Sequence, residues 1–313
     1  MAGKAGEPHT VAVAGTGAQA ATGALTAAGA PRSEWRAALR VIGRNRLALA
    51  ALVFLIGVHL IAVFAPQIAP ADPDKIATFR KFQTPNAEHL LGTDELGRDV
   101  LSRLIFGSRV SLIVGSLSMA LSLLIGLLIG AVAGYAGGAV DGVLMRFTDG
   151  VLTIPTFFLA LITVTVFGTS IENIILVIAL TSWMVVARVV RGEVLRASTT
   201  DYVLAARAVG VSPARLIWRH VLPSAIPSII VTATLGVANA ILTESALSYL
   251  GVGVQPPAST WGNMLSNAQN YLFRRPDLAI YPGVLIFLTV LAYNFFGDGL
   301  HDALDPRYRH KSS

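Results

Sequence analysis

Uncharged, apolar segments of similar length recur along this chain of 313 residues. An α-helix rises ~1.5 Å per residue, so about 20 residues are needed to cross a hydrocarbon core that is ~30 Å thick. The sequence therefore predicts an all-α, polytopic membrane protein with six transmembrane helices. The predicted spans are Leu47–Phe64, a stretch within Val110–Gly138, Val151–Phe167, Ile171–Val190, Ile226–Tyr249 and Leu278–Phe296.

The composition supports a membrane protein. Charged residues make up 13% of the chain, against roughly 25% in soluble domains. The chain contains no cysteine, which excludes disulfides, Cys-based zinc sites and iron–sulfur clusters from it. A net charge of +6 would suggest nucleic-acid binding in a soluble protein, but in a membrane protein an excess of Lys and Arg usually reports topology. We therefore expect the lipid bilayer, and no nucleic acid, around this chain.

The distribution of basic residues predicts the orientation. With six spans, both termini lie on the same side of the membrane. That side carries about twice as many Lys and Arg residues as the other, including Arg36, Arg40 and Arg44 before the first span. Both termini are therefore predicted to be cytoplasmic.

The loop between the fourth and fifth spans, Arg191–Pro223, has the pattern of two short helices with a break between them. Gly210 suits the left-handed conformation that ends a helix, and Ser212 with Pro213 suits the start of the next. Pro223 is expected to end this second helix. A rigid, bent, basic element of this kind can dock into another protein, although a solvated amphipathic connector would have a similar pattern.

The segment YVLAARAVGVSPARLIWRHVLP in this loop resembles the coupling-helix signature of bacterial ABC importer permeases: two alanines, a glycine and a proline at fixed spacing. Three other segments resemble signatures of the second permease of dipeptide, oligopeptide and nickel importers. They are LGTDELGRDVLSRLIFGSRVSL from Leu91, ESALSYLGVGVQPPASTWGNML from Glu244, and GDGLHDALDPR from Gly297. The resemblance covers about residues 34 to 309. Leu204 departs from the pattern, because the family commonly has Glu at that position.

The resemblance implies the fold of a type I ABC importer permease in the bacterial inner membrane. It implies a partner permease, two cytoplasmic ATPase subunits or one fused ATPase, and an extracellular binding protein that delivers the substrate. ATP and Mg would be bound by the ATPases, with no cofactor or metal in this chain and no catalytic residue. The residues implied in ATPase coupling are Ala205, Ala206, Arg207, Gly210, Arg215, Arg219 and Pro223.

The residues agree independently that the chain has no motor of its own. None of its lysines, Lys4, Lys75, Lys81 and Lys311, stands in the Gly-Lys-Ser/Thr context of a P-loop. Energy must therefore come from a partner or from an ion gradient. We expect an importer of di- or oligopeptides; a nickel-chelate permease of the same build is an alternative, and a gradient-driven secondary transporter is an alternative from another class.

The resemblance divides the chain into four parts. Residues 1–33, rich in Ala and Gly, are expected to form a disordered cytoplasmic tail. Residues 34–90 would hold the basic segment, the first span and the start of an extracellular loop. Residues 91–309 would form the permease transmembrane domain, with the coupling helix at about 200–223, and residues 310–313 a short tail. Within this domain, Thr93–Arg109 is expected to be a short helix, which either lies on the membrane surface or serves as a packing element.

Several residues within the spans are candidates for function or packing. Glu244 is expected roughly 27 Å along the fifth span, where it would contact a substrate amino terminus or the binding protein, or form a structural pair in a gate. His59 is expected to be a packing or hydrogen-bonding residue, and Asp149 to pair with Arg146. Small residues along the second span predict close helix packing against the partner permease, with a water-lined pathway as the alternative. They are Gly115, Ser116, Ser118, Ser122, Gly126, Gly130 and Gly134.

Overall fold

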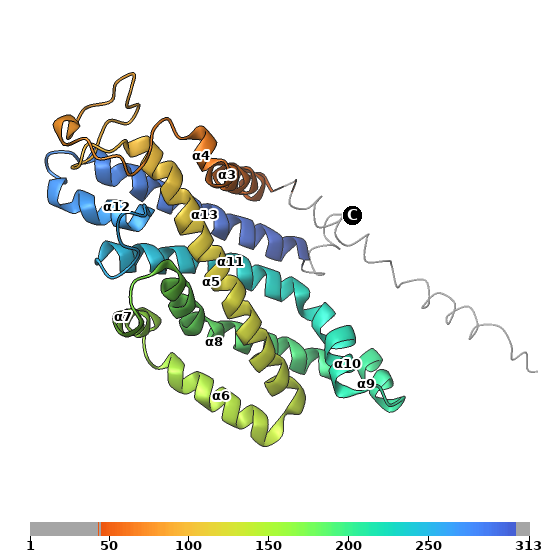
Figure 1. Cartoon of the computed structure of the whole chain (residues 1–313). Coiled ribbons are helices and arrows are strands. Elements are labelled where there is room, and N and C mark those ends of the chain that lie inside the picture. Colours follow the sequence, from red (N-terminus) through yellow and green to blue (C-terminus); the bar gives the residue numbers. More distant parts are fainter. Residues whose placement is uncertain (1–42, 44, 305–313) are drawn as a thin grey trace, which may run out of the picture.

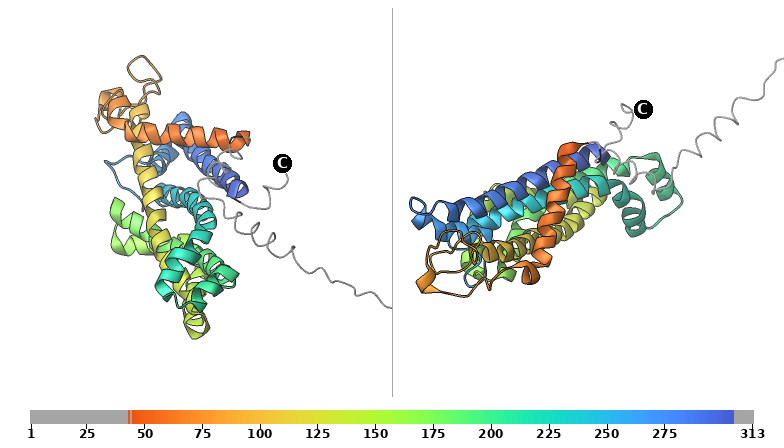
Figure 2. Two further views of the ribbon diagram at one scale, coloured as in Figure 1. Left: turned by 90° about the vertical axis from the view of Figure 1, so that its right-hand side faces the viewer. Right: turned by 90° about the horizontal axis from the view of Figure 1, so that it is seen from above.

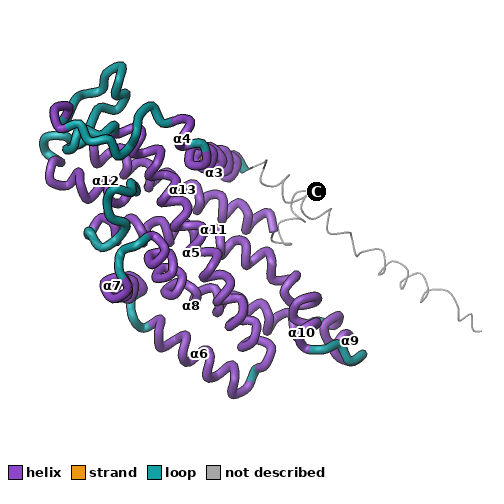
Figure 3. Tube along the Cα trace, in the orientation of Figure 1, coloured by secondary structure: helices purple, strands orange, loops and turns teal. Residues whose placement is uncertain are grey.

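The computed structural model describes residues 43 and 45–304, and this part of the chain is a helical bundle without strands (Figures 1 and 3). The predicted 1–33 and 310–313 tails lie outside the described residues. The α-helices are α3 (Arg46–Val63), α4 (Ala65–Ile68), α5 (Val100–Ala136), α6 (Gly138–Leu152), α7 (Thr156–Phe167), α8 (Ile171–Ser198), α9 (Asp201–Ala208), α10 (Pro213–Leu216), α11 (Leu222–Tyr249), α12 (Trp261–Ala268) and α13 (Asp277–Leu304). A five-residue π-helix, Ile217–Val221, joins α10 to α11.

Five helical segments are long and apolar enough to cross a membrane, and α6 with α7 makes a sixth if this bent pair is one span. α11 lies centrally and contacts α5, α8, α12 and α13, while α3 packs on α13 and α5 (Figures 1 and 2). α12 lies at one end of the bundle and α9 with α10 at the other; these are called the α12 end and the α9 end. The prediction of a helical membrane protein is confirmed.

The prediction of a separate short helix at Thr93–Arg109 is wrong. Residues 93–99 form a turn closed by a single bridge between Thr93 and Asp99, and α5 then runs without a break from Val100 to Ala136. Asp99 caps α5 by accepting a hydrogen bond from the backbone N–H of Ser102 at 2.8 Å. With a cap at this position and no proline or sharp break after it, the segment continues into the span instead of lying flat.

The third predicted span, Val151–Phe167, is also interrupted. α6 begins well before it, at Gly138, and ends at Leu152; α7 then leaves at an angle of 84° after the break. Pro155 is the physical reason, because proline lacks an N–H to continue the helix and disfavours helical geometry at the residue before it.

The small residues of the second span pack against this chain itself. A Cβ added at Gly126 would lie 2.5 Å from the Val186 Cβ, and one at Gly134 would lie 2.8 Å from the Val194 Cβ. Glycine therefore lets α5 and α8 approach so closely that their backbones nearly touch. The predicted close packing is confirmed, but these residues pack on α8 and α11 of the same chain instead of a partner permease. α6 and α7 lead the chain back after α5, so that α8 runs beside α5 in the same direction.

The long loop before α5 is fixed by buried polar contacts at the α12 end. Arg98 donates to Asp94 at 2.7 Å, and His89 lies 2.9 Å from Asp99; all four of these side chains are buried or nearly so. Arg275 donates to the backbone oxygen of Phe82 at 2.6 Å and thereby joins this loop to the start of α13. Its hydrogen bond with Asp277 raises the pKa of the Arg275 guanidinium further above its already high value. The loop is thus part of the packed structure.

Candidate functional site

The loop between α8 and α11 folds into a bent helical element, residues 200–223, called here the α9–α10 element (Figure 1). Gly210 follows α9 with a φ of +80°, and its N–H donates to the Arg207 oxygen at 3.1 Å. The N–H of Val211 donates to the Ala206 oxygen, also at 3.1 Å. These two bonds form the Schellman motif that ends a helix, so the predicted bend at Gly210 is present.

α9 and α10 begin after Thr200 and Ser212, two residue types that often cap helices, but neither side chain makes a cap hydrogen bond. Thr200 precedes α9, yet its hydroxyl donates back to the Ala197 oxygen at 2.6 Å. Ser212 precedes Pro213, the first residue of α10, without a side-chain cap bond. α10 therefore begins with the fixed φ of Pro213, whereas α9 begins without a proline or a side-chain cap.

The expectation that Pro223 ends the second helix is wrong. α10, the π-helix and α11 form one continuous helical run from Pro213 to Tyr249, and Pro223 lies in the first turn of α11. The π-turn accommodates the proline, which has no N–H to donate. Just before it, the backbone N–H of Leu222 donates to the oxygen of Ile217, five residues back. The α9–α10 element is therefore continuous with a membrane-spanning helix.

The exposed face of the α9–α10 element carries most of the predicted coupling residues. Ala205, Arg207, Gly210, Arg215 and Arg219 are exposed, and Ala206 is partly buried. The guanidinium of Arg207 lies over the ring of Tyr135 near the end of α5, 5.6 Å from the ring centroid.

Sequence reasoning missed the apolar residues on this face. Val209 is 81% exposed, and Tyr202, Leu204 and Trp218 are also exposed. Their signal was available in the sequence, because large apolar side chains in a short basic loop are unusual unless another surface covers them. A basic face with apolar residues at its tip is suited to docking in a groove of another protein.

The opposite face of the element is buried against the bundle. Val203 and Leu216 are completely buried and belong to one hydrophobic cluster with Val190 and Val194 of α8. Glu193 of α8 also accepts a hydrogen bond from Ser228 of α11 at 2.6 Å. The element is therefore packed directly against α8 and is continuous with α11.

Glu244 lies in α11 near the α12 end and is fully buried. Its carboxylate accepts hydrogen bonds from Ser248 at 2.8 Å and from Ser111 of α5 at 3.3 Å. The Ser111 oxygen in turn accepts from the backbone N–H of Trp261, the first residue of α12. Glu244 thus joins three helices through hydroxyl groups, and within the described residues its hydrogen-bond partners include no basic side chain.

This placement bears on the two roles expected for Glu244. A fully buried carboxylate does not reach a substrate or a binding protein at the surface in this conformation. A structural role at the junction of α5, α11 and α12 fits the contacts better.

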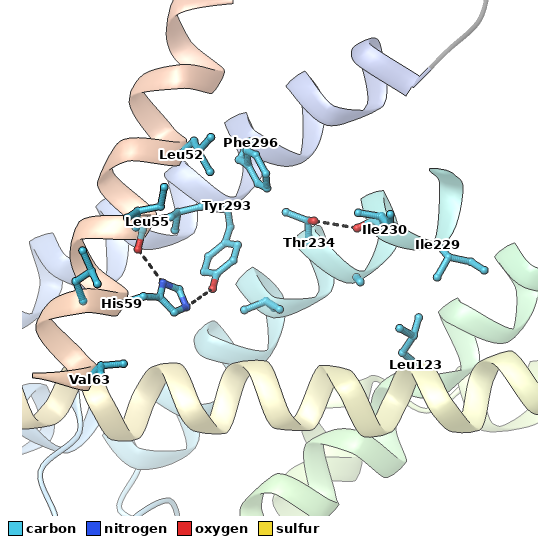
Figure 4. Close-up of a pocket in the computed structure, with 14 residues that line it drawn as sticks. Leu52, Leu55, His59, Val63, Leu123, Ile229, Ile230, Thr234, Tyr293 and Phe296 are labelled. Atoms are coloured by element: carbon cyan, nitrogen blue, oxygen red, sulfur yellow. Dashed lines mark hydrogen bonds between the residues drawn. The ribbon is translucent and has the colours of Figure 1, made fainter. Parts of the chain in front are cut away.

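An apolar groove of about 510 Å³ opens between α3, α11 and α13 (Figure 4). Leu55, Val237 and Phe296 are among its lining residues, and its polar groups include His59 and Tyr293. The Nδ1 of His59 lies 2.8 Å from the Leu55 oxygen, and its Nε2 lies 3.3 Å from the Tyr293 hydroxyl. Both ring nitrogens are thus used in internal hydrogen bonds, as expected for a structural histidine.

The described residues contain no cluster of three or more His, Asp or Glu side chains that could hold a metal ion. Asp149 pairs with Arg188 of α8, 2.5 Å away, and not with Arg146 as the spacing predicted. Asp149 therefore forms its ion pair with α8 instead of with a neighbouring residue of α6.

The chain is a bundle of membrane-spanning helices with an exposed basic element at one end, and comparison with known proteins identifies its family. Residues 126–310 match the model of the binding-protein-dependent transport system inner membrane component family. Residues 33–88 match that of the N-terminal transmembrane domain of oligopeptide transport permease C. The chain belongs to this family of ABC importer permeases and is a bacterial inner-membrane protein.

Curated relatives resemble the chain over nearly its full length. A dipeptide transport system permease protein of Alkalihalophilus pseudofirmus is 38% identical over 88% of this chain and 91% of the relative. A probable peptide ABC transporter permease protein of Sinorhizobium fredii is 42% identical over 91% and 97%. A glutathione transport system permease protein of Pectobacterium atrosepticum is 36% identical over 89% and 93%. The resemblance noted in the sequence is confirmed at the level of the family.

Proposed function

We propose that this chain is the second permease of an ATP-driven importer, and that it couples to cytoplasmic ATPase subunits through the α9–α10 element. The observation that carries the proposal is the construction of this element. Its exposed face is basic and has an apolar tip at Val209, whereas its other face is buried against α8. The element also continues without a break into the membrane-spanning helix α11. A movement of an ATPase bound to this element would therefore be passed on to α8 and α11.

The proposed arrangement has six spans, counting α6 and α7 as one, with both termini in the cytoplasm. The excess of Lys and Arg in the loops at the α9 end supports this orientation. The α9–α10 element is then cytoplasmic, and α12 with the loop before α5 faces the outside, where a binding protein would deliver the substrate.

The proposed partner in the membrane is a homologous permease. Large apolar side chains are exposed along several spans, and the groove between α3, α11 and α13 is open and almost entirely apolar. A second helical subunit would cover part of this surface. In the proposed assembly the ATPases, as two subunits or one fused chain, bind ATP and Mg, and this chain is a noncatalytic subunit.

The proposed substrates are di- or oligopeptides. The names of the relatives support this, since they refer to dipeptide, peptide and glutathione transport, and glutathione is itself a tripeptide. No observation on the structure favours the nickel-chelate alternative.

Affinity capture of the chain from its native membrane in mild detergent tests the proposal. Mass spectrometry should identify a second permease and ATPase chains in the captured complex. Val209→Asp should abolish capture of the ATPase without affecting membrane insertion, because the substitution places a charge on the apolar tip. Phe79→Asp is the matched control, since Phe79 is equally exposed but lies in the loop at the α12 end. Capture of the chain alone, with uptake driven by an ion gradient, would establish the secondary transporter instead.

A further inference from the structure

Two ion pairs join α6 to α8. Arg191 makes a bidentate contact with Asp141, at 2.5 and 2.6 Å, and Arg188 contacts Asp149 at 2.5 Å. The Arg191–Asp141 pair is partly buried, with side-chain exposures of 33% and 17%. The side chains of Arg188 and Asp149 are 51% and 52% exposed, so about half of each charged group faces away from this chain.

The Asp149–Arg188 pair lies inside the α9 end of the bundle, at a level that we infer to be within the membrane. Gly126 of α5 packs against Val186, and Gly130 packs against Ala187, so Arg188 lies close to the level of Gly130. α5 continues for six uncharged residues from Gly130 to Ala136, which is about 9 Å of helix. The pair is therefore roughly two helical turns inside the end of an apolar span.

An exposed ion pair at this depth does not face lipid chains, because charged side chains in the hydrocarbon region are costly and turn toward a protein interior or a water-filled cavity. Both groups also have unused hydrogen-bonding capacity. The structure records one bond from Arg188, through Nη2, to one oxygen of Asp149, while a guanidinium has five donors and a carboxylate two acceptor oxygens. Water, or a solute that carries both a carboxylate and an ammonium group, can use the remaining donors of Arg188 and acceptors of Asp149.

We propose that the Asp149–Arg188 pair lines the aqueous translocation pathway and contacts a zwitterionic solute as it passes. Arg188 binds the carboxylate of the solute and Asp149 its ammonium group. Phe147 of α6 is exposed and stacks on Trp183 of α8, with ring centroids 6.3 Å apart. This inference rests on the proposed importer function and specifies where a peptide-like substrate meets the chain.

Thiol labelling tests the water exposure of this face, and the chain offers a clean background because it has no cysteine. Val185→Cys and Leu176→Cys form a matched pair: both residues lie on α8 with exposures of 55% and 50%, but they are about 180° apart around the helix. Val185 is one turn from Arg188. The assembled transporter in inside-out vesicles is treated with a cationic, membrane-impermeant methanethiosulfonate, and the mass of this chain is followed.

Val185→Cys should be modified at least tenfold faster than Leu176→Cys. The rate should fall when ATP and vanadate hold the ATPases closed, since the inward opening then closes. Equal labelling of the two variants, or no labelling of Val185→Cys, would overturn the proposal and place the pair against the partner permease.

A charge exchange separates substrate contact from a merely structural ion pair. Arg188→Gln should lower peptide uptake in proteoliposomes about tenfold, the value of one charge-assisted hydrogen bond. The double variant Asp149→Arg with Arg188→Asp restores the attraction but reverses the charges presented to the solute, so uptake should stay low. Full recovery of uptake by the exchange would overturn the substrate contact. Capture of the ATPase with each variant shows separately whether the coupling function itself is intact.

Discussion

The bend at Gly210 provides the sharpest test of the proposed coupling to an ATPase. Gly210 has a φ of +80° in an open position, where an added Cβ would meet no atom within 4 Å. Substitutions therefore act through backbone conformation and not through a clash. We predict that ATPase capture and peptide uptake decrease in the order Gly, Asn, Ala, Pro at this position.

The expected magnitudes follow from the left-handed conformation. Asn tolerates it well, whereas most L-residues lose ~1–2 kcal/mol there. Since RT is about 0.6 kcal/mol, Gly210→Ala should weaken ATPase binding by about 5- to 30-fold if docking requires the bend. Gly210→Pro cannot form the bend, because proline fixes φ near −65° and removes the N–H that bonds to Arg207. Uptake should be abolished while membrane insertion stays intact.

The chain contains a matched control at its other end. Gly251 follows α11 with a φ of +79°, also in open space, and ends that helix with the same pair of backbone bonds, to Ser248 and Leu247. Gly251→Ala should have the same local conformational cost but leave ATPase capture unchanged. Captured ATPase is quantified by mass spectrometry and uptake with labelled dipeptide. Normal uptake and capture with Gly210→Pro would refute the coupling assignment.

Three further predictions concern contacts elsewhere in the chain. Glu244→Ala should lower the thermal midpoint in detergent, because unsatisfied buried hydroxyls cost ~1–3 kcal/mol, and Glu244→Gln should recover part of it; unchanged stability, assembly and uptake in both would exclude a role for this carboxylate. Arg215→Glu should weaken ATPase capture by about fivefold at most, since one exposed charge contributes ~1 kcal/mol or less; complete loss would contradict this. Gly130→Ala should destabilise the α5–α8 contact by ~1–3 kcal/mol through overpacking, whereas Gly142→Ala, in open space, should not; equal midpoints would contradict the packing argument.

The transmembrane helices could be predicted from the sequence to within a few residues at several ends. Arg46–Val63 was predicted as Leu47–Phe64, and the fifth span ends at Tyr249 as expected. The bend at Gly210 was equally accessible, because a glycine after a short helical pattern is a local signal. These features depend on hydropathy and backbone preference, which are properties of neighbouring residues.

Contacts between distant segments could not be predicted in this way. The glycines of α5 indicated close packing but not against which helix, and the charge of Asp149 indicated an ion pair but not that Arg188 is its partner. The π-turn that carries α10 past Pro223 into α11 likewise has no local signal.

The sequence alone determined that the chain is a helical membrane protein with a bent basic element in one loop, because the length of an apolar run and the freedom of a glycine are fixed locally. Only the tertiary structure decided that Glu244 is enclosed by hydroxyl groups of α5 and α11, and that Asp149 and Arg188 meet. Such contacts join residues that are far apart along the chain, so they exist only after the helices have packed.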